Sequence, residues 1–223
     1  TSRMLPFDQK YLLFDLETEG LNLAYSRPWE LSYVLGQGNK VIGKRQIYID
    51  IPDLDLPFFI KKLCGFDQKK YDREKIPPEE AWNHFKEYLY NPEYKILGQN
   101  ILKYDANILG VLSDMCGEKI DYSFIDRILD TRPLAVAHKE GLEKPRGNSS
   151  MTEWQYKILN DRSLKAKASQ KVLLKHFGIK HDPNLLHDGL YDCEMSWEIF
   201  KQLKKALELL YFLTKKIQTN TIG

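Results

Sequence analysis

Two carboxylates stand two positions apart at the end of an apolar segment, in the stretch YLLFDLETEG at residues 11–20. The first four residues predict a buried strand, and Asp15 and Glu17 follow at once. Because alternate side chains of a strand point to the same face, both carboxylates are expected on one face of a sheet. Taken alone, such a pair is more typical of a strand that leaves the core with its carboxylates solvated or ion-paired.

Two later segments carry further side chains that can do acid–base or metal chemistry. Asp105 follows a short apolar segment and begins a predicted helix, where the helix dipole also favours an acidic residue. His187 precedes Asp192, which lies inside the last predicted helix. Considered alone, that pair has an ordinary interpretation, a surface histidine beside a helix.

Together these segments resemble the three exonuclease motifs of the DEDD superfamily, in the subfamily whose fifth residue is a histidine. That family includes the proofreading epsilon subunit of bacterial replicative polymerases, ribonuclease T and oligoribonuclease. Its first motif, Asp-x-Glu-Thr-x-Gly-Leu, matches residues 15–21. The other two motifs, Asn-x4-Asp and His-x4-Asp, match Asn100 with Asp105 and His187 with Asp192. The resemblance covers residues 10–202 and includes the segments ILDTRPLA and LLKHFGI.

The resemblance implies a two-metal site for phosphodiester hydrolysis. Hard oxygen ligands select Mg²⁺ or Mn²⁺, and two such ions about 3.5–4 Å apart hold the attacking and leaving oxygens in line. By the resemblance, Asp15 bridges both ions, Glu17 and Asp192 complete the first, and Asp105 holds the second through water. His187 is then the general base, since an unperturbed histidine titrates near neutral pH.

Four further residues are expected to contact the substrate. By the resemblance, Thr18 lies near the 3′-hydroxyl and Leu21 is an apolar wedge against a base. The alternative is that the Thr18 hydroxyl only stabilises a turn and that Leu21 packs in the core. Asn100 belongs to the second motif. Tyr104 either stacks on a base or packs in the protein, and the sequence leaves both open.

The chain differs from the family's usual residues at four positions. The family often has Thr where Glu19 stands, His where Gln99 stands, Phe where Tyr104 stands and Ala where Gly189 stands. None of the differences removes a ligand or the base, so they bear on the substrate and leave the chemistry intact.

Other charged side chains favour simpler interpretations. Three lysines repeat every four residues along a predicted helix: Lys167, Lys171 and Lys175. A solvated helix face explains them better than a phosphate track. His176 and His181 precede His187 at irregular intervals without a nearby cysteine, which argues against a zinc site.

The elements that must position these residues follow from the periodicity and the turn residues. Residues 27–50 predict two strands after the first, 94–100 a short buried strand, and 127–131 a strand or turn. Helices are predicted at 76–90, 104–117, 164–178 and about 189–216, and an irregular insertion with a short helix at about 139–163. This order predicts an α/β sandwich around a mixed sheet. The resemblance sharpens it to a ribonuclease H-like fold, a mixed five-stranded sheet with helices on both faces.

Composition limits the class of protein. The 223 residues, 43% of them hydrophobic, predict a single domain over 1–223, and the formal charge of +2 argues against coating nucleic acid by bulk charge. Three scattered cysteines argue against a disulfide framework. No apolar run is long enough for a membrane span. We expect a cytoplasmic protein in a reducing compartment, without a membrane partner.

The functional prediction is a metal-dependent 3′→5′ exonuclease that releases nucleoside 5′-monophosphates from single-stranded DNA, as a proofreading or DNA-processing enzyme. A polymerase or replication protein is an expected partner. An RNA 3′-exonuclease like oligoribonuclease or ribonuclease T is the alternative within the class. A nucleic-acid- or polymerase-binding subunit with little turnover is the alternative from another class, and the complete set of five motif residues argues against it.

Overall fold

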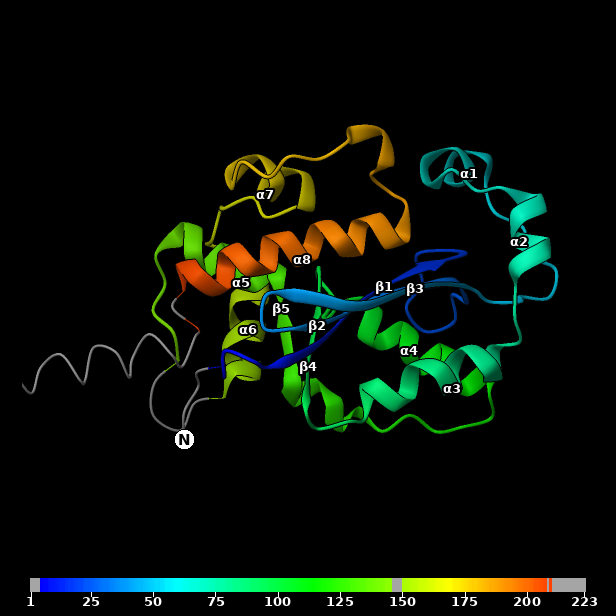
Figure 1. Ribbon diagram of the computed structural model, residues 1–223, viewed down its shortest axis with the longest axis horizontal. Coiled ribbons are helices and arrows are strands. Elements are labelled where there is room, and N and C mark those ends of the chain that lie inside the picture. The colour runs from blue at the N-terminus through cyan, green and yellow to red at the C-terminus, as the bar shows by residue number, and fades with distance from the viewer. Residues whose placement is uncertain (1–4, 146–149, 208, 210–223) are drawn as a thin grey trace, which may run out of the picture.

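A five-stranded mixed sheet forms the centre of the protein in the computed structural model, which describes residues 5–145, 150–207 and 209 (Figure 1). The strand order is β3-β2-β1-β4-β5. The first three strands are antiparallel, and β4 and β5 run parallel to β1. Their bounds are β1 (Lys10–Thr18), β2 (Pro28–Gln37), β3 (Lys40–Tyr48), β4 (Tyr94–Gly98) and β5 (Ile128–Asp130). The predicted sheet is therefore confirmed.

Helices cover both faces of the sheet (Figure 1). The face that α3 and α4 cover belongs to one apolar core, and the face that α5, α7 and α8 cover belongs to a second. The α-helices are α1 (Phe58–Cys64), α2 (Gln68–Glu74), α3 (Pro78–Leu89), α4 (Asp105–Met115), α5 (Thr131–Glu140), α6 (Met151–Asn160), α7 (Gln170–His176) and α8 (Gly189–Ala206); the 3-10 helices are η1 (Tyr122–Arg127) and η2 (Pro183–Leu185). Among the described residues, no helix is both long and apolar enough to cross a membrane.

The pleat of β1 decides which way its carboxylates point. Phe14 belongs to the core under α3, where its ring lies 5.1 Å from that of Phe85. Tyr11 belongs to the opposite core, with its ring 5.7 Å from Trp197 of α8. Because side chains alternate along a strand, Asp15 and Glu17 share the face of Tyr11. The end of β1 therefore directs both carboxylates toward the α8 side of the sheet.

The helix predicted at 164–178 is shorter in the structure. It begins at Gln170, because the Ser169 hydroxyl caps it by accepting the backbone N–H of Val172 at 3.3 Å. The preceding segment is extended, and the Glu140 carboxylate accepts the backbone N–H groups of residues 165 and 166. Lys167 therefore lies outside the helix, and the three lysines do not form one helical stripe.

The predicted insertion at 139–163 is more regular than its sequence indicates. Gln155 of α6 is fully buried, accepts the backbone N–H of Asp130 at 2.7 Å and donates to the carbonyl of Ile128 at 2.9 Å. These bonds fix α6 against β5, so the short helix predicted within the insertion is confirmed and packs against the sheet. Residues 146–149, in the Gly- and Ser-rich part of the prediction, lie outside the described residues.

The sequence analysis predicted no helix at three of the α-helices, α1, α2 and α5, or at the 3-10 helices η1 and η2. The last helix ends at Ala206, and the predicted continuation over 210–216 lies outside the described residues. The helices predicted at 76–90 and 104–117 are confirmed within one or two residues at each end.

Candidate active site

Three of the predicted metal ligands converge on one point. Asp15, Glu17 and Asp192 each offer a carboxylate oxygen, and these oxygens all lie within 4.8 Å of one another. The strand supplies the first two from one face, and the first turn of α8 supplies the third. Asp188 fixes the start of that helix, since its side chain accepts the backbone N–H of Tyr191 at 3.0 Å.

The electrostatics of this cluster favour a bound cation. Burial, followed by the charges of Glu17, Asp105 and Asp192, raises the pKa of Asp15 well above its ordinary value. Burial and the charge of Glu30 raise the pKa of Glu17 to about 8, and burial raises that of Asp192 to about 6. Carboxylates held this close repel one another unless a cation neutralises them. The set of hard oxygen donors therefore fits a divalent metal ion.

Asp105 lies beside this cluster but outside the three-oxygen group. It begins α4 and is 8% exposed, and its Oδ2 accepts the backbone N–H of Leu16 at 3.3 Å. Burial raises its pKa to about 8. Leu16 stands between the two carboxylate residues of β1, so this bond holds Asp105 against the strand at the cluster. The structure thus brings all four predicted ligands to one end of β1.

Glu30 is a fifth buried carboxyl group that the sequence analysis missed. It lies on β2 directly opposite Glu17, is 5% exposed and has a pKa that burial raises to about 7. The Ser32 hydroxyl at 3.2 Å and the Gln46 amide at 3.3 Å hold its Oε1. A Cβ at Gly189 would collide with the same oxygen, so a larger first residue of α8 would require the Glu30 side chain to move. A glutamate within the apolar strand WELSYVL was the available signal, but the strand register that pairs it with Glu17 is not visible in the sequence.

His187 is exposed at the edge of the cluster. Its backbone adopts a φ of +75°, a conformation that non-glycine residues rarely take, and its N–H donates to Asp192 Oδ1 at 3.1 Å. It lines a hollow of about 210 Å³ together with Asp15, Asp192 and Gln170. The structure therefore places this imidazole beside the carboxylates, and its role as a base stays a prediction.

Two of the four predicted substrate residues follow the cluster along the chain: Thr18 is the last residue of β1, and Leu21 lies in the turn after it. The Thr18 hydroxyl donates to the carbonyl of Gly20 at 2.6 Å, so it has the turn contact that the sequence analysis ranked second, while its oxygen can still accept a hydrogen bond. Leu21 is 96% exposed and so is not a core leucine.

The other two lie in the loop between β4 and α4. Tyr104 is 42% exposed, with the Lys103 ammonium 5.7 Å from its ring centre, so its ring is partly open to a ligand. Asn100 has a φ of +59°, and its buried side-chain oxygen has no hydrogen-bond partner among the described residues. An unpartnered buried acceptor is free to meet a ligand donor.

One buried aspartate fixes this loop. Asp130 is fully buried and accepts three backbone N–H groups: from Asn100 at 2.7 Å, Leu102 at 3.0 Å and Arg132 at 2.9 Å. The Gln99 amide adds a bond to the carbonyl of Ala168 at 2.7 Å. These bonds set the path of the chain into α4 and thereby the position of Asp105. In the sequence analysis Asp130 appeared only as part of a family-like segment.

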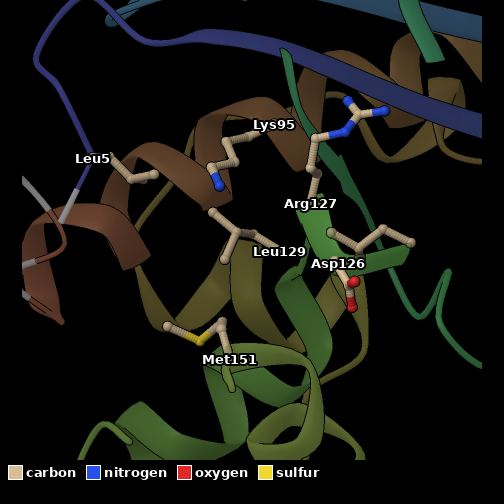
Figure 2. A pocket seen from close by; sticks show the side chains of 7 residues that line it. Leu5, Lys95, Asp126, Arg127, Leu129 and Met151 are labelled. Carbon is tan, nitrogen blue, oxygen red and sulfur yellow. The ribbon is translucent and has the colours of Figure 1, made fainter. Parts of the chain in front are cut away.

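The remaining histidines lie elsewhere. His176 Nε2 is 3.4 Å from His138 Nε2, and His181 Nδ1 is 2.9 Å from the carbonyl of Ile179. A second hollow, of about 180 Å³, opens near the start of β4 and β5 and contains none of the predicted site residues (Figure 2). Lys95 and Arg127 are among its lining residues.

Comparisons with known proteins agree with this geometry. The profile of the exonuclease family RNase_T matches residues 12–200. Among solved structures, E. coli exonuclease I in complex with a dA16 oligonucleotide is similar with a TM-score of 0.69 and 18% identity, over 92% of this chain and 43% of that one. The same enzyme with a dT13 oligonucleotide gives 0.67 and 19%, over 89% and 41%. Its zinc-bound complex with single-stranded DNA gives 0.68 and 19%, again over 89% and 41%. The chain thus spans less than half the length of these structures. No curated protein sequence matches it.

Proposed function

The chain belongs to the exonuclease family, and on that premise we propose that it is a metal-dependent 3′→5′ exonuclease that acts on single-stranded DNA and releases nucleoside 5′-monophosphates. The observation that carries the proposal is the convergence of Asp15, Glu17 and Asp192 within 4.8 Å, at the end of a strand in a family whose reaction is hydrolytic. Burial raises the pKa of all three carboxyl groups, and neighbouring carboxylates raise those of Asp15 and Glu17 further, so the ionised cluster is costly without a cation.

In this proposal the carboxylates of Asp15, Glu17 and Asp192, with Asp105 beside them, hold two divalent ions, Mg²⁺ or Mn²⁺. Bound there, the ions would supply a water of lowered pKa and neutralise charge on the phosphate. His187, at the rim of the same hollow, is placed to accept a proton from the attacking water. The hydrogen bond from its backbone to Asp192 keeps the base and the ligand in a fixed relation.

The choice of DNA has independent support. The similar exonuclease I structures are complexes with DNA oligonucleotides. RNA remains the alternative substrate, and a polymerase or replication-protein partner stays a prediction from the resemblance.

The turn after β1 gives the proposed reaction its direction. Thr18 follows a metal ligand by one residue, and its hydroxyl oxygen can accept a hydrogen bond from a free 3′-hydroxyl. A 3′-phosphate at that place would bring negative charge against the carboxylates. Leu21, fully exposed in the same turn, can press against the terminal base. A paired end must first fray, which costs a few kcal/mol and less at a mismatch.

The test uses 5′-labelled DNA and RNA strands of equal sequence, incubated with the protein in Mg²⁺, Mn²⁺ or EDTA. We expect stepwise shortening from the 3′-end that needs metal, is faster on DNA than on RNA, and is slower on a 3′-phosphate or a matched duplex. Circular single-stranded DNA should survive. Its efficient cleavage would identify an endonuclease and refute the proposal, and faster digestion of RNA would assign the alternative substrate.

A further inference from the structure

Helix α1 presents an apolar face to solvent. None of its seven residues is buried, and Phe58, Phe59 and Leu63 are 81%, 67% and 55% exposed. Phe59 and Leu63 are one helical turn apart, so they share a face. Two neighbouring exposed phenylalanines are rare on a surface that meets only water, and a contiguous patch of this kind marks an interaction site.

The same corner of the molecule is basic. The segment from Phe58 to Lys70 contains four lysines, at positions 61, 62, 69 and 70, and a single acidic residue, Asp67. The Asp67 carboxylate is occupied as the cap of α2, where it accepts the backbone N–H groups of residues 69 and 70. Within the part of the chain that the structure describes, none of the four lysines forms an ion pair. Lys61 and Lys70 lie over the rings of Phe66 and Tyr48, and Lys70 also lowers the pKa of Glu30 by its charge. Lys62 and Lys69 are therefore the charges most open to an anionic ligand.

This corner adjoins the carboxylate cluster. Cys64 and Lys70 line one small hollow together with Glu30 and Asp188. Phe66, between α1 and α2, packs edge-on against Trp29, with the ring centres 5.2 Å apart. Trp29 immediately precedes Glu30. Figure 1 shows α1 next to the segment that leads into α8. A strand with its 3′-end at the cluster thus needs to extend only a short way to reach α1.

We propose that the α1–α2 corner, residues 58–70, binds the single strand behind its 3′-terminal nucleotide, with bases stacked on Phe58 and Phe59 and phosphates paired with the lysines. This inference rests on the proposed function, because it takes the cluster as the place of the 3′-end. Aromatic faces accept any base, and lysines track the backbone, so the surface suits a sequence-independent strand. A second copy of the chain suits it less, because two such surfaces would bring lysines against lysines.

The first test replaces both aromatic side chains, Phe58→Ser with Phe59→Ser. The matched control is Val41→Ser with Ile42→Ser, two exposed apolar residues of β3 near the hairpin turn at the opposite end of the sheet. Affinity for a labelled dT16 strand is measured by fluorescence anisotropy in EDTA, where metal-dependent cleavage does not run. Stacking on one aromatic side chain accounts for roughly 5- to 150-fold in affinity. We expect at least a tenfold loss in the Phe58/Phe59 variant and none in the control.

A kinetic arm separates this inference from the proposed function. The p-nitrophenyl ester of thymidine 5′-monophosphate is small enough to reach the cluster without touching α1. The Phe58/Phe59 variant should hydrolyse it within twofold of the unaltered protein, while kcat/KM for dT16 falls at least tenfold. Unaltered protein that hydrolyses neither substrate refutes the proposed function, and the binding arm still decides the role of α1.

A charge arm tests the lysines by Lys62→Glu and Lys69→Glu. Each phosphate contact that is lost should lower the slope of log affinity against log salt by about 0.7. If dT16 affinity and its salt slope are unchanged in the aromatic and the lysine variants alike, the inference is wrong, and the surface is left to a protein partner.

Discussion

Two buried acidic regions lie at the carboxyl ends of two parallel strands, β1 and β5, on either side of β4, and they differ in what surrounds them. Asp130, at the end of β5, is fully buried and accepts three backbone N–H groups. Asp15 and Glu17, at the end of β1, face other carboxylates. Burial raises the pKa of Asp130 to about 6, although the three N–H donors lower it. For Asp15 and Glu17 the neighbouring charges raise the pKa further.

The difference separates a structural carboxylate from a ligand-binding one. A buried charge that the protein itself neutralises with hydrogen bonds stabilises the local fold. A buried charge that the protein surrounds with more negative charge is costly unless something from outside neutralises it. The predictions below test this contrast by altering each side of it in turn.

The largest effect is expected from removing a clustered carboxylate. Asp15→Ala or Asp192→Ala should lower the exonuclease rate on the order of 10⁴-fold, since a metal ion accounts for several kcal/mol of transition-state stabilisation. The midpoint of thermal unfolding in metal-free buffer should be equal or higher, because repulsion is relieved. Asp126→Ala, an exposed acidic residue of the second hollow (Figure 2), is the control and should leave both unchanged. A clustered variant that unfolds without metal would show the residue to be structural.

His187 tests whether the cluster needs a separate base. His187→Ala should lower kcat by roughly 10²- to 10⁴-fold with little change in substrate binding. His181→Ala is the control, because its ring contacts only the carbonyl of Ile179 among the hydrogen bonds of the structure. Single-turnover kinetics on a labelled strand measures both. Retention of most activity by the His187 variant would leave proton removal to the metal-bound water alone.

The structural side of the contrast is tested at Asp130. Asp130→Ala leaves three backbone N–H groups without an acceptor, so the free energy of unfolding should fall by about 3 kcal/mol or more, with or without metal. Asp121→Ala is the matched control, because the exposed Asp121 side chain caps η1 by accepting a single backbone N–H, that of Ser123. This substitution should lower the free energy of unfolding by about 1 kcal/mol. Urea unfolding in EDTA gives both values. Equal losses in the two variants would contradict the structural role of Asp130.

The smallest effect is expected at Gly189, where α8 meets Glu30. Gly189→Ala places a Cβ against Glu30 Oε1, which must move toward Glu17 or away from its donors. Because small displacements at a reacting site lower its rate strongly, kcat/KM should fall by about tenfold. Gly43→Ala, whose Cβ would meet only the Leu35 side chain, is the control. An unchanged rate would show that Glu30 does not position the cluster.

The sequence predicted the strands and the motif residues because their signals are local. Apolar runs, turn residues and the Asp-x-Glu spacing need no knowledge of partners. The sequence analysis missed Glu30 and Asp130 because their roles depend on residues far away in the chain. The register of β1 with β2 places Glu30 opposite Glu17. The path of the chain after β4, together with the start of α5, brings three backbone N–H groups to Asp130. The sequence analysis missed helix α1 because it is only seven residues long and has no capping side chain at its start.

The central claim is that the carboxylates of β1 and α8 are held together for a cation. Its most direct test is the free energy of unfolding against pH, in EDTA and in Mn²⁺. A carboxyl group with a raised pKa in the folded protein stabilises the fold fully below its unfolded pKa and loses that contribution as pH rises through its folded pKa. Here the window runs from about 4 to about 8, the latter being the pKa of Glu17 and Asp105.

We therefore predict that the metal-free protein loses stability as pH rises from about 4 to about 8, that Mn²⁺ restores it most at the high end, and that Asp15→Asn flattens both effects. Stability that is independent of pH across this window, together with no stabilisation by Mn²⁺ at pH 8, would contradict the account.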